Sequence, residues 1–257
     1  MNYNFKPLEI GGLKTSLPIV QGGMGVGISL SGLASAVANE GGVGVIAAAS
    51  IGMFEPGFAN DFVKANITAL KKEIHKARQM TQGILGVNIM VALTNFADMV
   101  KTAIDEGIDI IFSGAGLPLN LPQYLKKGSR TKLVPIVSSP RAAAVITKHW
   151  VKKYNYVPDA FVVEGPLAGG HLGFNEQQLR DPDYSLEKII PQVVAEVKVA
   201  AEKYQKSIPV IAAGGVYSGA DIHKFLELGA SGVQMATRFV TTEECDASPE
   251  FKQAYLE

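Results

Sequence analysis

Short apolar runs separated by amphipathic segments are the main pattern of this chain of 257 residues. Eight runs are rich in valine and isoleucine and nearly continuous, which is typical of parallel strands buried on both faces. They lie at residues 18–21, 43–47, 84–90, 108–113, 132–138, 159–165, 208–215 and 231–239. Most neighbouring runs begin about 25 residues apart, which is the length of one strand, one helix and two short loops. The pattern therefore predicts eight β/α units.

Helical spacing of apolar residues fills most of the intervals between these runs. It predicts helices over residues 30–40, 96–106, 140–154, 185–204 and 218–228, with a further one beginning at Pro249. Gly41, Gly107 and Gly229 follow three of them, and glycine is a common C-terminal stop. Two intervals, 50–82 and 172–208, are longer and have room for extra loop around one helix.

Eight alternating units can form either a closed barrel or an open, doubly wound sheet. The open sheet is disfavoured because no GxGxxG pattern follows the first run, where a dinucleotide-binding domain carries it. The segment Gly22–Gly27 is rich in glycine, but its spacing differs, and no acidic residue closes the second run. We therefore predict an α/β fold, a (β/α)₈ TIM barrel, as one domain over residues 1–257.

Composition and charge exclude several classes of protein. Lys and Arg together number 24, as do Asp and Glu, so there is no basic excess for a nucleic-acid partner. Residues 15–39 carry no charge, but Pro18, Gln21 and five glycines favour a strand, a loop and a helix over a membrane span. The first ten residues lack the apolar core of a secretory signal, so we expect a cytoplasmic protein. Cys245 is the single cysteine, and no Cys/His spacing suggests a metal site.

Small and amide residues follow seven of the predicted strands, where the loops of a barrel build its functional site. Glycine there lets a flat ligand lie close to the main chain. Segments 212–219 and 234–237 follow the seventh and eighth strands, where barrels frequently bind phosphate; the alternative is that Gly214 and Gly215 only turn the chain. The candidate ligand-binding residues at these ends are Gln21, Gly22, Gly23, Met24, Asn88, Glu164, Gly214, Gly215, Gln234, Ala236 and Thr237.

His171 is the strongest single candidate for chemistry. It lies just beyond the sixth predicted strand, in a stretch too rich in glycine to be a packed helix face. A histidine there can exchange a proton near neutral pH, although it could instead only bond a backbone carbonyl. We predict a catalytic role for His171, and surface positions on helices for His75, His149 and His223.

Taken in order, the segments PIVQGGMG, GVNIM, GAG, EGPLAGGHLG, PVIAAGGV and GVQMATRF resemble the nitronate monooxygenases, formerly called 2-nitropropane dioxygenases. They are also similar to the related FMN-containing enoyl-ACP reductases. The resemblance runs from residue 18 to about residue 246, which is nearly the whole chain. Each segment alone is a weak signal, but the ordered set is specific.

The resemblance implies FMN as the cofactor and a role for each matched residue. Gly22, Gly23, Met24 and Asn88 would contact the isoalloxazine ring and ribityl chain, and Glu164, Gly169 and Gly170 would flank the flavin. Gly214 with Gly215, and Ala236 with Thr237, would hold the FMN phosphate. His171 matches the histidine of the GGH motif and would act as the base or positioning group.

The resemblance also implies oxidation of alkyl nitronates with O₂ to a carbonyl compound and nitrite. NAD(P)H-dependent reduction of an enoyl thioester or a quinone is the second interpretation, and a non-catalytic flavin-binding barrel is the third. Residues 175–191 are longer than in the enoyl reductases, which favours the monooxygenase. We expect a small-molecule substrate, no membrane and no nucleic acid, and leave a homodimer open. Because family members continue well past Thr237, we expect the last barrel helix and a lid portion to be missing.

Overall fold

A computed structural model describes residues 5–257, in which eight parallel strands close into a barrel. This TIM barrel is the predicted fold, and all eight predicted strands are present. Their order around the barrel follows the sequence, with β10 returning to β3. The strands are β3 (Ile19–Gln21), β4 (Val43–Ala47), β5 (Ile84–Asn88), β6 (Ile110–Ser113), β7 (Lys132–Val137), β8 (Phe161–Glu164), β9 (Val210–Ala213) and β10 (Gly232–Met235).

Helices alternate with these strands, and the predicted ones are confirmed within a residue or two at most ends. Residues 50–82, a long interval in the sequence, hold α2, whose Asp61 cap accepts a hydrogen bond from the Lys64 backbone N–H (2.9 Å). The helices are α1 (Ser31–Asn39), α2 (Phe62–Met80), α3 (Phe96–Asp105), α4 (Pro140–Tyr154), α5 (Glu176–Arg180), α6 (Leu186–Tyr204), α7 (Gly219–Glu227), α8 (Thr237–Val240) and α9 (Pro249–Gln253), with 3₁₀ turns at Leu121–Tyr124 and Pro182–Tyr184. Among the described residues, no helix combines the length and apolarity needed to cross a membrane.

Three details of the fold differ from the sequence prediction. The interval 172–208 holds two helices, α5 and α6, where one was predicted. Strands β1 (Glu9–Ile10) and β2 (Leu13–Lys14) form an antiparallel hairpin that the pattern did not indicate, because each has only two residues. Gly11 and Gly12 turn it with positive φ angles of 56° and 91°, as a tight two-residue turn requires. The eighth strand was predicted to reach residue 239, but β10 ends at Met235 and residues Thr237–Val240 form α8.

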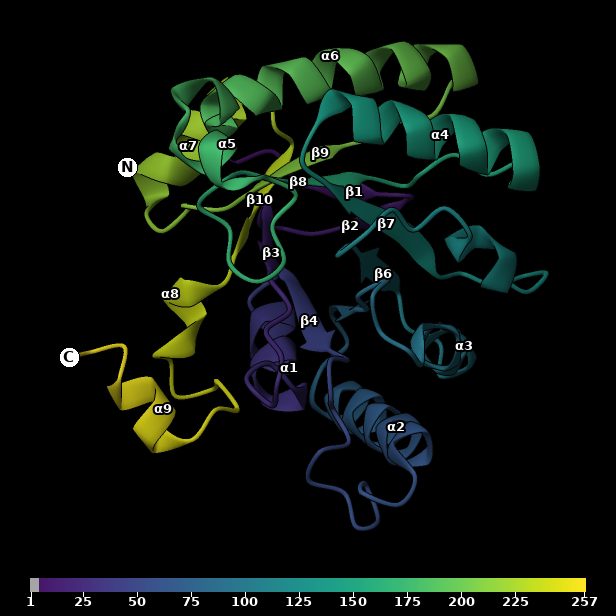
Figure 1. Cartoon of the computed structure of the whole chain (residues 1–257), viewed down its shortest axis with the longest axis vertical. Coiled ribbons are helices and arrows are strands. Elements are labelled where there is room, and N and C mark those ends of the chain that lie inside the picture. Colours follow the sequence, from purple (N-terminus) through teal and green to yellow (C-terminus); the bar gives the residue numbers. More distant parts are fainter. Residues whose placement is uncertain (1–4) are drawn as a thin grey trace. The chain divides into compact units, whose positions relative to one another are not determined.

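Contacts within the chain define two compact units. One comprises residues up to Ile19, Ser113–Gln123 and Lys132–Met235, and the other comprises Val20–Phe112, Tyr124–Thr131 and Ala236–Glu257. In the first unit α6 packs alongside α4, and in the second α2 packs against α3 (Figure 1). The assignment of residues 1–257 to one FMN-binding domain stays a prediction.

The packing of α1 on β4 explains why β4 contains a glycine. Every residue of β4 is buried, as the apolar run Val43–Ala47 predicts. A Cβ atom added at Gly44 would overlap the backbone carbonyl of Ala34 in α1. Glycine at this position therefore lets the helix approach the strand main chain more closely than any other residue would allow.

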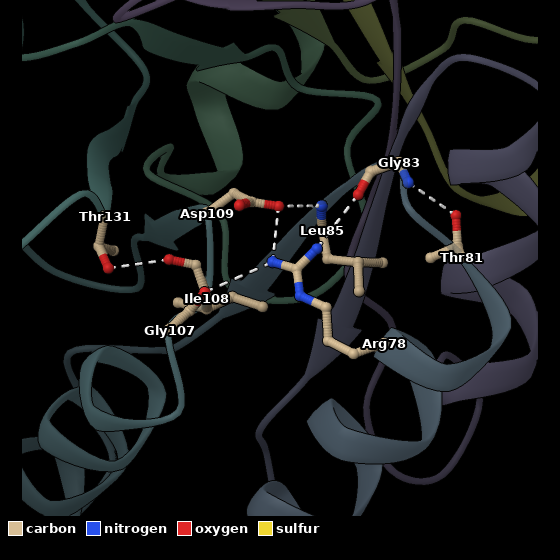
Figure 2. A network of polar contacts seen from close by, with 8 residues as sticks. All are labelled: Arg78, Thr81, Gly83, Leu85, Gly107, Ile108, Asp109 and Thr131. Atoms are coloured by element: carbon tan, nitrogen blue, oxygen red, sulfur yellow. Dashed lines mark hydrogen bonds and ion pairs between the residues drawn. The ribbon is translucent and has the colours of Figure 1, made fainter.

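A carboxylate at the start of β6 ties three segments together (Figure 2). Asp109 accepts a hydrogen bond from the Leu85 backbone N–H at the start of β5 (2.9 Å) and forms an ion pair with Arg78 of α2 (2.7 Å). Arg78 also donates to the carbonyl oxygens of Gly83 and Gly107. One guanidinium group thus joins the end of α2 to the beginnings of β5 and β6.

The same arrangement recurs two strands further along. Asp159, which precedes β8 and is 3% exposed, accepts from the Leu133 backbone N–H of β7 (2.8 Å). Its second oxygen pairs with the Lys206 ammonium (2.8 Å), and the Tyr156 hydroxyl donates to the carboxylate. Burial and the negative charge of Asp159 raise the pKa of Tyr156, so this phenol stays neutral and remains a donor.

Replacing Asp159 with alanine is expected to lower the free energy of unfolding by about 1.5–3 kcal/mol, the range for hydrogen bonds to charged groups. The change would leave the Leu133 N–H and the Lys206 ammonium without their acceptor, although Lys206 is partly exposed and regains water. Urea unfolding measures the effect. The control is Asp183→Ala, which removes an exposed ion pair with Lys188 (3.8 Å) and should leave the transition midpoint unchanged. Equal midpoints for all three proteins would contradict the role given to Asp159.

Candidate functional site

Gln21, the last residue of β3, uses its side chain to hold main chain at the end of this strand. It is fully buried. Its Oε1 accepts a hydrogen bond from the Val45 backbone N–H of β4 (2.8 Å), and its Nε2 donates to the carbonyl of Gly22. The amide is thus engaged by the backbone on both sides, and it fixes the beginning of the loop that follows β3.

The structure brings the predicted residues Gly23 and Asn88 together at neighbouring strand ends. Asn88 is the last residue of β5, and its carbonyl accepts from the Ala48 backbone N–H (3.0 Å). A Cβ atom added at Gly23 would overlap Cβ of Asn88. A glycine at position 23 is therefore what permits the loop to cross this close to Asn88.

Ser29 closes the loop after β3, which we call the glycine loop (residues 22–29). Its hydroxyl accepts from the Met24 backbone N–H (2.8 Å), and its own N–H donates to the Met24 carbonyl (3.0 Å). The Ser29 carbonyl in turn accepts from the Ala47 N–H at the end of β4 (3.0 Å). Met24, a predicted ligand-binding residue, thus has both backbone polar groups bonded within the loop.

Two carboxylates occupy the N-terminus of α1, directly after the glycine loop. Asp246 accepts from the backbone N–H groups of Leu30, Gly32 and Leu33 at 2.7, 3.0 and 3.1 Å. Glu73 of α2 accepts from the Ser31 N–H at 2.9 Å. A dinucleotide-binding fold places a phosphate at the N-terminus of the helix after its first strand. In this chain acidic side chains already accept those N–H groups, so the helix offers no such anion site.

The loop after β8 packs against both neighbouring strand ends. A Cβ atom added at Gly173 would lie 2.5 Å from Oγ of Ser138, which follows β7. One added at Gly214, which follows β9, would lie 2.7 Å from the Ala168 backbone nitrogen. The segment that carries His171 is therefore fixed at both ends, next to the glycine pair predicted to bind phosphate.

Gly214 and Gly215 adopt backbone conformations that favour glycine. Their φ angles are 101° and 73°. A Cβ atom at Gly215 would also come within 2.9 Å of Cδ1 of Leu167, a side chain that is 78% exposed. The loop after β8 thus lies close against this turn, and the role of the two glycines in binding phosphate stays a prediction.

Glu164, the last residue of β8, has an unusual carboxyl group. Burial raises its pKa to about 7, because a charged carboxylate is poorly solvated there. Its backbone pairs with Ala213 of β9, which places it beside the glycine turn. Glu164 can therefore hold or release a proton near neutral pH at a strand end where ligands are expected.

His171 is exposed, and so are its neighbours Gly169 and Gly170. A Cβ atom added at either glycine would meet nothing within 4 Å, so the middle of the loop is open although its ends are packed. An imidazole in this position is accessible to a small molecule. The catalytic role of His171 stays a prediction.

The remaining predicted residues have less defined surroundings. Gln234 of β10 is half-buried and pairs with Ala213. Ala236 and Thr237 begin α8, which has only four residues, and Thr237 is exposed. The surface prediction for His149 was wrong in part: the side chain is half-buried, and its buried Nε2 has no hydrogen-bond partner among residues 5–257.

A family model described as nitronate monooxygenase matches residues 6–257. Among curated relatives, a (3aS,4S,5R,7aS)-5-hydroxy-7a-methyl-1-oxo-octahydro-1H-indene-4-carboxyl-CoA dehydrogenase of Mycobacterium tuberculosis is 31% identical over 93% of this chain and 57% of its own length. A probable nitronate monooxygenase of Staphylococcus haemolyticus is 28% identical over 95% of this chain and 70% of its own.

Solved structures agree with these matches. FabK from Thermotoga maritima superimposes with a TM-score of 0.70 at 31% identity, over 93% of this chain and 64% of that one. The nitroalkane oxidase of Streptomyces ansochromogenes has a TM-score of 0.71 at 24% identity, which supports the fold alone. The chain thus spans a little more than half the length of the dehydrogenase and under two thirds of FabK.

Because the pKa of Glu164 is raised, we expect the Glu164→Gln variant to gain stability over the parent protein as the pH rises from 4.5 to above 7, both without cofactor. Between these values the unfolded chain loses the Glu164 proton while the folded chain keeps it, so this carboxyl lowers stability as pH rises. The stability difference between variant and parent should grow over this window by up to about 3 kcal/mol and then level off. Urea unfolding across pH measures it, with Glu176→Gln, an exposed position, as control. A pH-independent difference for Glu164→Gln would contradict the assignment.

Proposed function

The chain belongs to the nitronate monooxygenase family, and we propose that it binds FMN and oxidises alkyl nitronates with O₂ to a carbonyl compound and nitrite. Flavin-dependent oxidoreduction is the general chemistry of this family. The observation that carries the proposal is the exposed His171 on a loop whose ends are packed at the ends of β7 and β9, in a chain matched along residues 6–257.

The residues at the strand ends fit FMN by their shape and their donors. In one unit, the glycine loop and Asn88 are packed so closely that main chain, and not side chains, would face the flat ring. In the other unit, Gly214 and Gly215 have no side chains of their own, so their backbone N–H groups would be available to a phosphate. FMN suits these features better than a dinucleotide, because Asp246 and Glu73 occupy the N-terminus of α1.

Bound flavin would supply the electron acceptor, and the chain would supply orientation and proton transfer. In the proposed role, His171 takes the proton from the carbon next to the nitro group, or steers a nitronate that has already lost it. The Gln21 amide holds the Gly22 carbonyl in place, and the Ser29 hydroxyl holds Met24, so the glycine loop keeps one shape while ligands exchange. Glu164 would add a second group that changes protonation near pH 7.

Gly214→Val should weaken FMN binding by at least tenfold, because a side chain at φ 101° would push against the Ala168 nitrogen and occupy the space where the phosphate approaches. Gly128→Val is the control: this glycine also has a positive φ angle, of 86°, but it lies outside the predicted phosphate segments, and an added Cβ would meet nothing within 4 Å. Fluorescence titration of FMN gives both dissociation constants. Unchanged affinity in Gly214→Val would remove the phosphate assignment, and no FMN binding by the unmodified chain would refute the cofactor.

His171→Ala should leave the fold and bound FMN intact, since the side chain is exposed. Positioned acid–base groups contribute about 10²- to 10⁴-fold, so kcat/KM for a neutral nitroalkane should fall on that scale. The loss should be smaller for a preformed nitronate, because its proton has already gone. His223→Ala, an exposed histidine in α7, should leave both values unchanged. Full activity of His171→Ala on both substrates would make His171 a structural residue.

The second candidate is NAD(P)H-dependent reduction of an enoyl thioester or a quinone. A relative of 31% identity is named as a dehydrogenase of a carboxyl-CoA compound, which supports redox chemistry on a thioester in place of a nitronate. Stopped-flow reduction of bound flavin separates the candidates. Rapid reduction by NAD(P)H would favour the reductase, reduction only by a nitronate would favour the monooxygenase, and reduction by neither would favour a flavin-binding protein without turnover.

A further inference from the structure

The segment after α8 returns to the glycine loop through paired contacts. The Asp246 backbone N–H donates to the Ile28 carbonyl (3.2 Å), and the Cys245 thiol donates to the same oxygen (3.3 Å). Cys245 is buried, at 4% exposure. Residues 241–257, which we call the C-terminal segment, are therefore attached to the loop itself as well as to the helix that follows it.

Asp246 is the centre of this attachment. Its two oxygens accept the three backbone N–H groups of Leu30, Gly32 and Leu33. The N-terminus of a helix carries partial positive charge, so a carboxylate there gains from the helix dipole and from charge-assisted hydrogen bonds. Glu73 accepts only one N–H, from Ser31, and it comes from α2. Asp246 thus supplies most of the acceptors for the first turn of α1.

Gly32 makes the close approach of Asp246 sterically allowed. A Cβ atom added there would lie 2.5 Å from Oδ1 of Asp246 and 3.1 Å from the Glu244 carbonyl. The two partners are separated by more than 200 residues and still fit without a side chain between them. The contact therefore requires both residues: the carboxylate of Asp246 as the acceptor, and a glycine at position 32 to make room for it.

We propose that Asp246 is a positioning residue for the glycine loop, and that FMN binding and attachment of the C-terminal segment stabilise each other. This inference rests on the proposed function, in which the loop faces the flavin. One end of the loop is fixed by Gln21, and the other end is fixed by Ser29 and Asp246. Without the Asp246 carboxylate, the N–H groups of Leu30, Gly32 and Leu33 lose this acceptor, so the helix that follows the loop no longer holds its second end as firmly.

Coupling between two sites is reciprocal, so an effect of the C-terminal segment on FMN binding requires an equal effect of FMN on the attachment of the segment. If an attached segment orders the loop for FMN, then FMN must reduce the opening of the segment by the same factor. The C-terminal segment and the flavin need no direct contact with each other, because both act on the glycine loop.

The experiment compares Asp246→Asn with Asp61→Asn in the full chain. Asparagine keeps the size of the side chain but removes its charge and one acceptor. Asp61 caps α2 by a single bond to the Lys64 N–H in an exposed position, so it controls for loss of a helix-capping carboxylate. We expect Asp246→Asn to raise the FMN dissociation constant by about 5- to 150-fold, the usual range of such coupling, and to alter the visible circular dichroism of bound FMN. Asp61→Asn should change neither.

Amide hydrogen exchange, measured with and without FMN, tests whether the ligand stabilises the attached segment. FMN should slow exchange in residues 241–257, and this protection should be lost in Asp246→Asn. Unchanged exchange on adding FMN, or an Asp246→Asn protein with parental affinity and spectrum, would overturn the inference and leave the proposed function intact. No FMN binding by the unmodified chain would overturn both.

Discussion

Carboxylates that accept backbone N–H groups hold the segments of this chain in register. Asp109 and Asp159 do so where β6 and β8 begin, and Asp246 does so where α1 begins. Each bond joins residues that are far apart in the sequence, so it forms only when the neighbouring elements are in place. The strand ends that carry the candidate site depend on these bonds, because the loops after the strands are rich in glycine and have few side chains of their own that form contacts.

Most of the fold could be predicted from periodicity because parallel strands buried on both faces leave continuous apolar runs. Val43–Ala47 and Ile110–Ser113 are buried at every position, so their pattern is unmistakable. The boundary at Met235 could not be predicted, because the four residues Ala236–Phe239 are too few to show a helical period. The chain leaves the strand only through the backbone angles of Ala236, with φ −127° and ψ −65°. The hairpin at Glu9–Lys14 is too short to have a period.

The candidate site was predictable only where one residue type implies one geometry. Glycine at Gly214 and Gly215 implied close backbone approach, and both have positive φ angles. The ligand contact predicted for Gln21 stays a prediction, and the bonds of its amide to main chain are a second role that residue identity alone does not reveal. Asp246 gave no signal at all: its partners at Leu30 to Leu33 are identified only once the chain has folded.

The loop after β8 combines fixed ends with an open centre, and this makes it a natural place for a reporter group. Gly169 is exposed, a Cβ atom added there would meet nothing within 4 Å, and its backbone needs no positive φ. Cys245, the single cysteine of the sequence, is buried. A thiol introduced at Gly169 would therefore be the accessible one, and a fluorophore attached to it would report the polarity of the surroundings of His171.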